Sequence, residues 1–172
     1  MHRSAGLLMA LMLTSPAHAA GGRAHEHGVV RVDVAVQGDS FTVNLDAPLD
    51  SLLGFERAPR NDKERQAVDE VLARLRSGAG LFDADAAAQC TLGKAEVSAP
   101  VLEAGAAAMG GHADIDAGYE LRCAQPAQLR TLDLGLFEAF RRIQRIDVQV
   151  AGARGQVKAT LKRPARSVRL VR

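Results

Sequence analysis

The sequence predicts an α+β fold, mostly antiparallel sheet with one main amphipathic helix and a C-terminal hairpin. Apolar and polar side chains alternate in residues 29–36 and 112–123. This pattern predicts half-buried strands, because alternate side chains of a strand point to opposite faces. Residues 61–76 instead repeat apolar side chains at helical spacing, which predicts the helix. Two further alternating runs on either side of residues 152–155 predict the C-terminal hairpin.

The first half of the chain predicts a hairpin followed by helices. Residues 29–36 and 41–46 flank the turn at 37–40, and Pro48 ends the second strand. Residues 49–55 are short and apolar, and predict one helical turn packed on the sheet. Asn61 can cap the main helix, since Glu64 follows at capping-box spacing, and Gly78 can end it.

The second half predicts several short strands. The strand at 90–97 is expected to pair antiparallel with 112–123 across a flexible Ala/Gly-rich loop at 100–111. Further strands are expected near residues 132–136, 146–150, 157–161 and 168–171, with a short helix or bend at 137–143.

The N-terminus predicts export. Arg3 precedes an apolar run, Leu7 to Leu13, and Ala17 and Ala19 occupy the small positions that signal peptidase requires. We expect a signal peptide at 1–19 and a single domain at 20–172. No segment of the mature chain has the roughly 18 apolar residues of a transmembrane helix. The expected location is therefore outside the cytosol.

The two cysteines predict a disulfide. In an oxidising compartment a lone pair usually forms one bond, and the proposed strand pairing places Cys90 and Cys123 at the open end of a hairpin. The alternative is a pair of thiolate metal ligands, but the close spacing of a zinc knuckle is absent.

The charge pattern does not favour nucleic acid as a partner. The formal net charge is +2, yet residues 141–172 hold ten Lys or Arg and one acid, Asp147. These bases alternate with apolar residues, and aromatic side chains for base stacking are few, which favours a solvated sheet face.

Four residues predict a metal site. His25 and His27 would share one face of an extended segment, and His112 and Asp114 repeat that spacing at the start of a strand. Three imidazoles and a carboxylate would complete a tetrahedral zinc site if the segments meet. The alternative is that these histidines are simply solvated. No catalytic motif of a hydrolase or phosphate-binding loop is present, so an enzyme is not expected.

Several segments together resemble a known family. They are residues 25–28 (His-Glu-His-Gly), 54–59 (Gly-Phe-Glu-Arg-Ala-Pro), 81–82, 90–92, 112–115 with Tyr119 and Cys123, and 134–140 (Leu-Gly-Leu-Phe-Glu-Ala-Phe). In this order they resemble the bacterial periplasmic ZrgA-type proteins over nearly all of the mature chain. For residues 54–59 we favour a structural role, with Phe55 packed into the sheet, over ligand or partner contact.

The resemblance implies a periplasmic zinc-binding protein that works with components of an envelope zinc-uptake transporter. Such proteins often carry a long His-, Asp- and Glu-rich insertion before the His-Ala-Asp strand, whereas residues 103–111 here are Glu-Ala-Gly-Ala-Ala-Ala-Met-Gly-Gly. We therefore expect few zinc ions per chain. The main alternative is a non-catalytic envelope scaffold or adaptor with little metal binding. A secreted metallohydrolase is a third hypothesis.

Overall fold

The computed structural model describes residues 26–102 and 113–170. The predicted signal peptide, His25, His112 and most of the predicted loop lie outside the described residues. The first residues of that loop, Pro100–Leu102, form a short 3-10 helix. None of the helices in the described part of the chain is long and apolar enough to cross a membrane.

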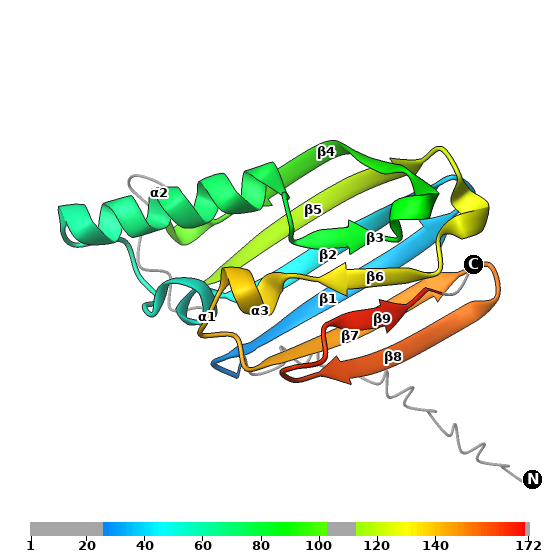
Figure 1. Ribbon diagram of the computed structural model, residues 1–172. Helices are drawn as coiled ribbons and strands as arrows, with labels where there is room; N and C mark the ends of the chain where they lie inside the picture. Colours follow the sequence, from blue (N-terminus) through cyan, green and yellow to red (C-terminus); the bar gives the residue numbers. More distant parts are fainter. Residues whose placement is uncertain (1–25, 103–112, 171–172) are drawn as a thin grey trace, which may run out of the picture.

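A six-stranded sheet forms the back layer of the molecule (Figure 1). Its order is β4-β5-β2-β1-β7-β8. Every neighbouring pair is antiparallel except β1 and β7, which run parallel. The strands are β1 (Val29–Gln37), β2 (Ser40–Pro48), β4 (Cys90–Ser98), β5 (Asp114–Cys123), β7 (Arg145–Gly152) and β8 (Gly155–Leu161).

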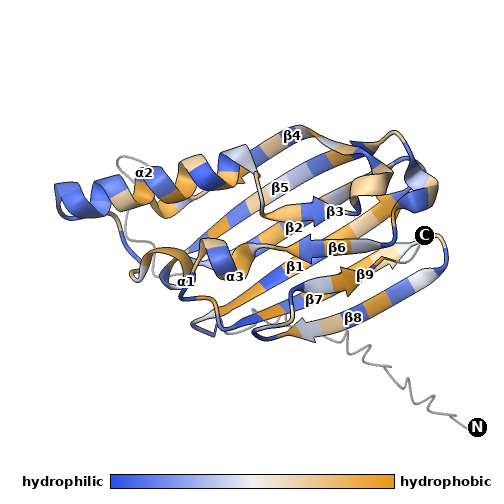
Figure 2. Cartoon of the chain, in the orientation of Figure 1, coloured by the Kyte–Doolittle hydropathy of each residue, from blue (hydrophilic) through white to orange (hydrophobic). Residues whose placement is uncertain are grey.

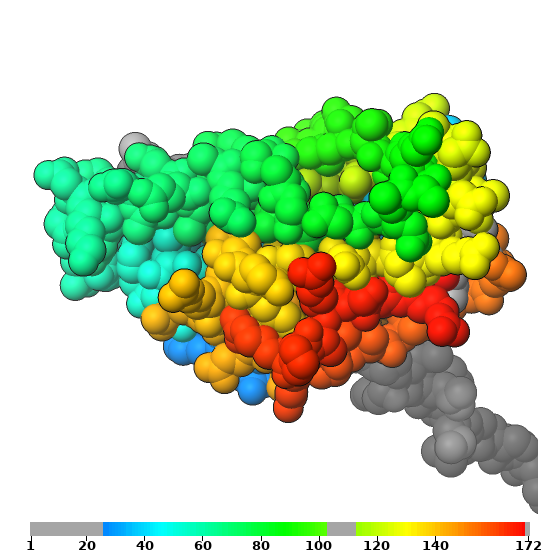
Figure 3. Space-filling view, in the orientation of Figure 1, coloured from blue at the N-terminus to red at the C-terminus, as the bar shows by residue number. Residues whose placement is uncertain are grey.

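Helices and a small second sheet cover one face of the large sheet (Figures 1 and 3). The small sheet has the order β3-β6-β9. The second layer comprises α1 (Leu49–Leu53), α2 (Asp62–Ser77), α3 (Leu136–Ala139), β3 (Phe82–Ala84), β6 (Thr131–Leu134) and β9 (Ser167–Arg169). Short 3-10 helices connect the two layers: Ala86–Ala88 lies between β3 and β4, and Pro126–Gln128 lies between β5 and β6.

The core lies between the two layers and follows the alternation of the strands. Val30, Val32, Val34 and Val36 of β1 are all buried, while the side chains between them face outward. Figure 2 shows the same alternation of apolar and polar positions along neighbouring strands. Tyr119 of β5 joins the layers, because its ring lies 4.8 Å from that of Phe82 and its hydroxyl donates to the carbonyl of Leu75.

The predicted fold class is confirmed, with differences in detail. The predicted strand at 132–136 ends at Leu134, and Leu136 begins α3. The three-residue strand β3 was not predicted, because it is too short to show alternation. The pairing of β1 with β7 was also not predicted, since nothing local records a contact between distant segments.

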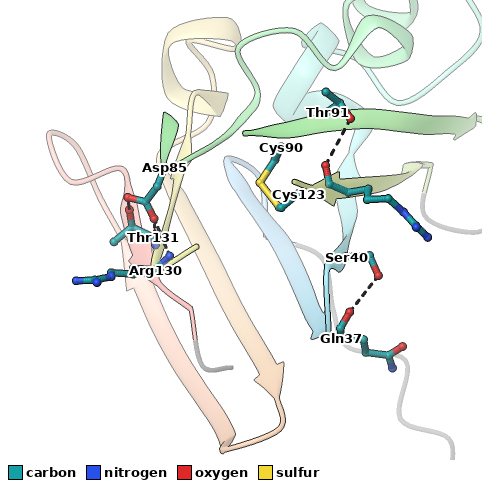
Figure 4. Close-up of a disulfide and its surroundings, with 9 residues drawn as sticks. Gln37, Ser40, Asp85, Cys90, Thr91, Cys123, Arg130 and Thr131 are labelled. Carbon is teal, nitrogen blue, oxygen red and sulfur yellow. Dashed lines mark hydrogen bonds between the residues drawn. A yellow bond between two sulfur atoms is a disulfide. The ribbon is translucent and has the colours of Figure 1, made fainter. Parts of the chain in front are cut away.

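The predicted disulfide is present. Cys90 and Cys123 are direct cross-strand partners on β4 and β5, and their sulfurs are bonded (Figure 4). Close by, Asp85 accepts hydrogen bonds from the backbone amides of Arg130 and Thr131 and from the Thr131 hydroxyl. These contacts tie the loop after β3 to the start of β6.

Helix α2 begins at the predicted cap. The side chain of Asn61 accepts from the amide of Glu64 at 2.9 Å. The Glu64 carboxylate accepts from the amide of Arg60, one residue before the cap, and from both terminal nitrogens of Arg57. The Arg57 hydrogen bonds, followed by the Arg60 amide, lower the pKa of Glu64 to about 2.

This pKa shift predicts a pH-dependent effect of Glu64→Gln. The pKa of the Glu64 carboxyl is lower in the folded protein than in the unfolded chain. Its charge therefore stabilises the folded protein fully above the unfolded pKa of about 4.5, and this stabilisation is lost as the pH falls through about 2. Urea unfolding should therefore show the variant to be less stable at neutral pH, with a difference that shrinks between about pH 4.5 and 2. Glu70→Gln, on the same helix, is the control. A difference that stays constant across that range would contradict the assignment.

Candidate metal centre

His27 lies in a tight turn just before β1. The amide of Val29 donates to the carbonyl of Glu26 at 3.0 Å, and Gly28 has a φ of +79°. A Cβ on Gly28 would lie 3.1 Å from Cγ of Gln144 and 3.2 Å from the carbonyl oxygen of Arg142. Glycine is therefore required here both for its backbone conformation and for the close approach of the chain.

Two other segments hold this turn by its backbone. The amide of Gly28 donates to Oγ of Ser51, a buried side chain on α1, at 2.9 Å. The carbonyl of Gly28 accepts from the amides of Gln144 at 2.7 Å and Arg145 at 3.0 Å. The position of His27 is thus fixed by hydrogen bonds to the backbone of Gly28, and its own side chain takes no part in them.

The imidazole of His27 lies between two carboxylates. Its Nε2 is 3.2 Å from Oε1 of Glu56, and its Nδ1 is 3.7 Å from Oδ2 of Asp50. The His27 side chain is 65% exposed, so an ion from solvent can reach it. The side chain of Glu26 instead pairs with Arg145 at 2.8 Å.

Arg142 fixes Asp50. Its Nε donates to the backbone carbonyl of Asp50 at 2.8 Å, and one terminal nitrogen donates to Oδ1 at 3.1 Å. The guanidinium passes over Gly54, where a Cβ would lie 3.1 Å from Cζ of Arg142. Gly54 also ends α1 with a φ of +86°. This glycine therefore shapes the turn and leaves room for the arginine.

Asp114 lies at the same end of the sheet as His27. It is the first residue of β5 and pairs with Pro48 at the end of β2. Strand β2 separates β5 from β1, so the two backbones are about 10 Å apart. No group of three or more His, Cys, Asp or Glu side chains suited to a metal is found among residues 26–102 and 113–170. Because His25 and His112 lie outside these ranges, the shared four-ligand site stays a prediction.

Sequence reasoning missed Glu56 and Asp50. Residues 54–59 were interpreted as structural, with Phe55 packed into the sheet. In the structure Phe55 is half-buried and outside the core, and its ring is covered by the Arg57 guanidinium, 4.9 Å from the centroid. Glu56 could have been identified because it is a carboxylate within residues 54–59, one of the segments that carry the resemblance to the family.

A hollow on the outer face of the sheet is a weaker candidate for zinc. It has a volume of about 880 Å³, and Asp33, Asp46, Glu96 and Asp116 line it. Burial, together with the facing Asp46, raises the pKa of Asp116. Among the described residues that line the hollow there is no histidine or cysteine, and carboxylates alone favour harder cations than zinc.

Several of the C-terminal bases are already paired with acids. Arg142 contacts Asp50, Arg145 contacts Glu26 and Asp147, and Arg166 contacts Asp133 and Glu138. These contacts agree with the predicted solvated, charge-balanced surface. The expectation that nucleic acid is not a partner stays a prediction.

The comparison with known families assigns the chain to a family. The family described as "ZrgA family zinc uptake protein" matches residues 24–170 of the chain. The chain belongs to the ZrgA family. The match includes His25, His27, His112 and Asp114, together with Asp50 and Glu56. A search of curated proteins finds no significant match. Membership relates this chain to zinc uptake, and its cluster around His27 has the imidazole and carboxylate groups that bind zinc.

Proposed function

We propose that this ZrgA family member is a periplasmic zinc-binding accessory protein of an envelope zinc-uptake system, and that it acts without catalysis. The observation that carries the proposal is the His27 imidazole, exposed and fixed beside Glu56 and Asp50. Imidazole and carboxylate are both common zinc ligands. The disulfide and the expected signal peptide support a location in an oxidising compartment.

In this proposal the protein binds zinc through His25, His27 and His112, with Asp114 as the predicted carboxylate. Residues 103–111 contain no histidine, so the chain lacks the means to buffer many ions. One zinc per chain is the expected stoichiometry. The bound ion would then pass to a transporter component of the envelope.

The competing function is a scaffold or adaptor with little metal binding. The observation in its favour is that the described residues contain no group of three metal ligands. Such a protein would contact a transporter through its sheet or its basic C-terminal face.

Native mass spectrometry of the mature protein with one equivalent of zinc separates the two functions. We expect one zinc retained per chain and removed by a chelator, because a site with several protein ligands keeps its ion under these conditions. Magnesium at the same concentration is the control, since that ion prefers oxygen ligands. A chain that retains no zinc would contradict the accessory role and favour the scaffold.

A further inference from the structure

His27 and Glu56 are spaced like two ligands of one zinc ion. Zinc lies about 2.0–2.1 Å from nitrogen or oxygen ligands, so two ligands at a tetrahedral angle are about 3.3 Å apart. The distance between Nε2 of His27 and Oε1 of Glu56 is 3.2 Å. An ion could therefore bind both atoms with little movement of either side chain.

The second nitrogen of the same imidazole faces Asp50. In zinc sites, a ligating histidine commonly donates its other N–H to a carboxylate, which fixes the ring and its tautomer. Asp50 is suited to this position because its side chain is only 17% exposed and Arg142 holds its other oxygen. At 3.7 Å, the contact between Asp50 and Nδ1 needs a small shift to become a hydrogen bond.

Glu56 is not neutralised by the arginine that follows it. Arg57 turns away, forms a paired contact with Glu64 at 2.6 and 3.0 Å, and stacks on Phe55. In the part of the chain that the structure describes, the ion-pair partner of Glu56 is His27. The Glu56 side chain is 37% exposed, so its carboxylate is accessible to a hydrated ion.

We propose that Nε2 of His27 and the carboxylate of Glu56 bind the same zinc ion, and that Asp50, held by Arg142, positions the imidazole. The inference rests on the proposed zinc-binding function and replaces Asp114 with Glu56 as the carboxylate ligand. It also gives residues 54–59 a chemical role, since this segment carries Glu56 to the turn that carries His27.

Titration calorimetry with zinc tests Glu56 as a ligand. Glu56→Gln keeps the size of the side chain and removes its charge, and should weaken zinc binding by at least tenfold, because even partners outside the first shell are worth about 10–100-fold. Asp114→Asn should bind as the wild type does. The control is Glu70→Gln, an exposed glutamate of α2 that contacts Gln66 and should also leave affinity unchanged.

The outcomes separate this inference from the proposed function. Loss of affinity in Asp114→Asn with none in Glu56→Gln would overturn the inference and leave zinc binding intact. Equal affinity in Glu56→Gln and wild type would do the same. A wild type that binds no zinc would overturn both. Thermal unfolding of each metal-free variant checks that the fold is unchanged.

Nitrogen NMR of the zinc-loaded protein tests the role of Asp50. The geometry predicts zinc on Nε2 of His27 and the proton on Nδ1, because Nε2 faces Glu56 and Nδ1 faces Asp50. Asp50→Asn should weaken this preference and reduce zinc affinity about tenfold. A purely structural role would leave the choice of nitrogen unchanged. Zinc bound to Nδ1 of His27 in the wild type would overturn the assignment.

Discussion

Replacing His25 and His27 together with alanine is expected to remove most of the zinc affinity and leave the fold intact. The fold should survive because the turn at residues 26–29 is held through the backbone of Gly28 and not through imidazole. The loss should exceed the roughly 10–100-fold effect of changing a partner outside the first shell, because ligand atoms themselves are removed. Calorimetry on the wild type and the double variant measures it, with circular dichroism as the check on folding.

The matched comparison is the variant His112→Ala. If the predicted four-ligand site exists, its zinc affinity should fall as well, since all three histidines would bind one ion. Zinc affinity of the wild type should also weaken as the pH is lowered, because only neutral imidazole binds metal. Equal zinc affinity in the wild type and the His25/His27 double variant would eliminate the N-terminal pair as ligands.

Loss of the disulfide is expected to have the largest effect on stability. Replacing Cys90 and Cys123 with alanine should lower the free energy of unfolding by roughly 3 kcal/mol, because the bond closes a loop of 33 residues in the unfolded chain. The bond lies between β5 and β4, an edge strand that α2 also contacts. Denaturant unfolding of the wild type and of the double alanine variant measures the effect.

Adding a reductant provides the control for this prediction. It should destabilise the wild type by a similar amount and leave the alanine variant unchanged. Thiol titration of the unfolded, unreduced protein should find close to no free thiols. Two titratable thiols per chain, or a wild type whose stability does not respond to reductant, would contradict the prediction.

The central strands of the large sheet could be predicted because the burial of their side chains follows the alternation of apolar and polar residues in the sequence. In β1, β2 and β5 every second side chain is buried in the core, so these strands carry a clear period of two. The helix cap at Asn61 was predicted correctly because it depends on residues close together in the sequence, Asn61 and Glu64. In contrast, the parallel pairing of β1 with β7 depends on the packing of distant segments and has no local signature.

The candidate site could be predicted only in part, for the same reason. His27 was recognised from its spacing to His25. Glu56 follows α1 and Arg142 precedes β7, and nothing in their own neighbourhoods shows that the fold brings both to the turn before β1. Only the completed packing places the carboxylate of Asp50 against Nδ1.

The long-range support of the His27 turn has a consequence for the order of events during folding. Glu26 and its partner Arg145 are 119 residues apart in sequence, and Gly28 is held by the amides of Gln144 and Arg145. Contacts between such distant residues carry a loop-closure cost and form slowly compared with local ones. If the chain is exported unfolded, as its N-terminus predicts, its imidazoles would cross the membrane without their carboxylate neighbours. Under the proposed zinc-binding function, zinc capture would wait until the C-terminal strands have formed and β7 has docked beside β1, so the appearance of zinc affinity would report completion of the sheet.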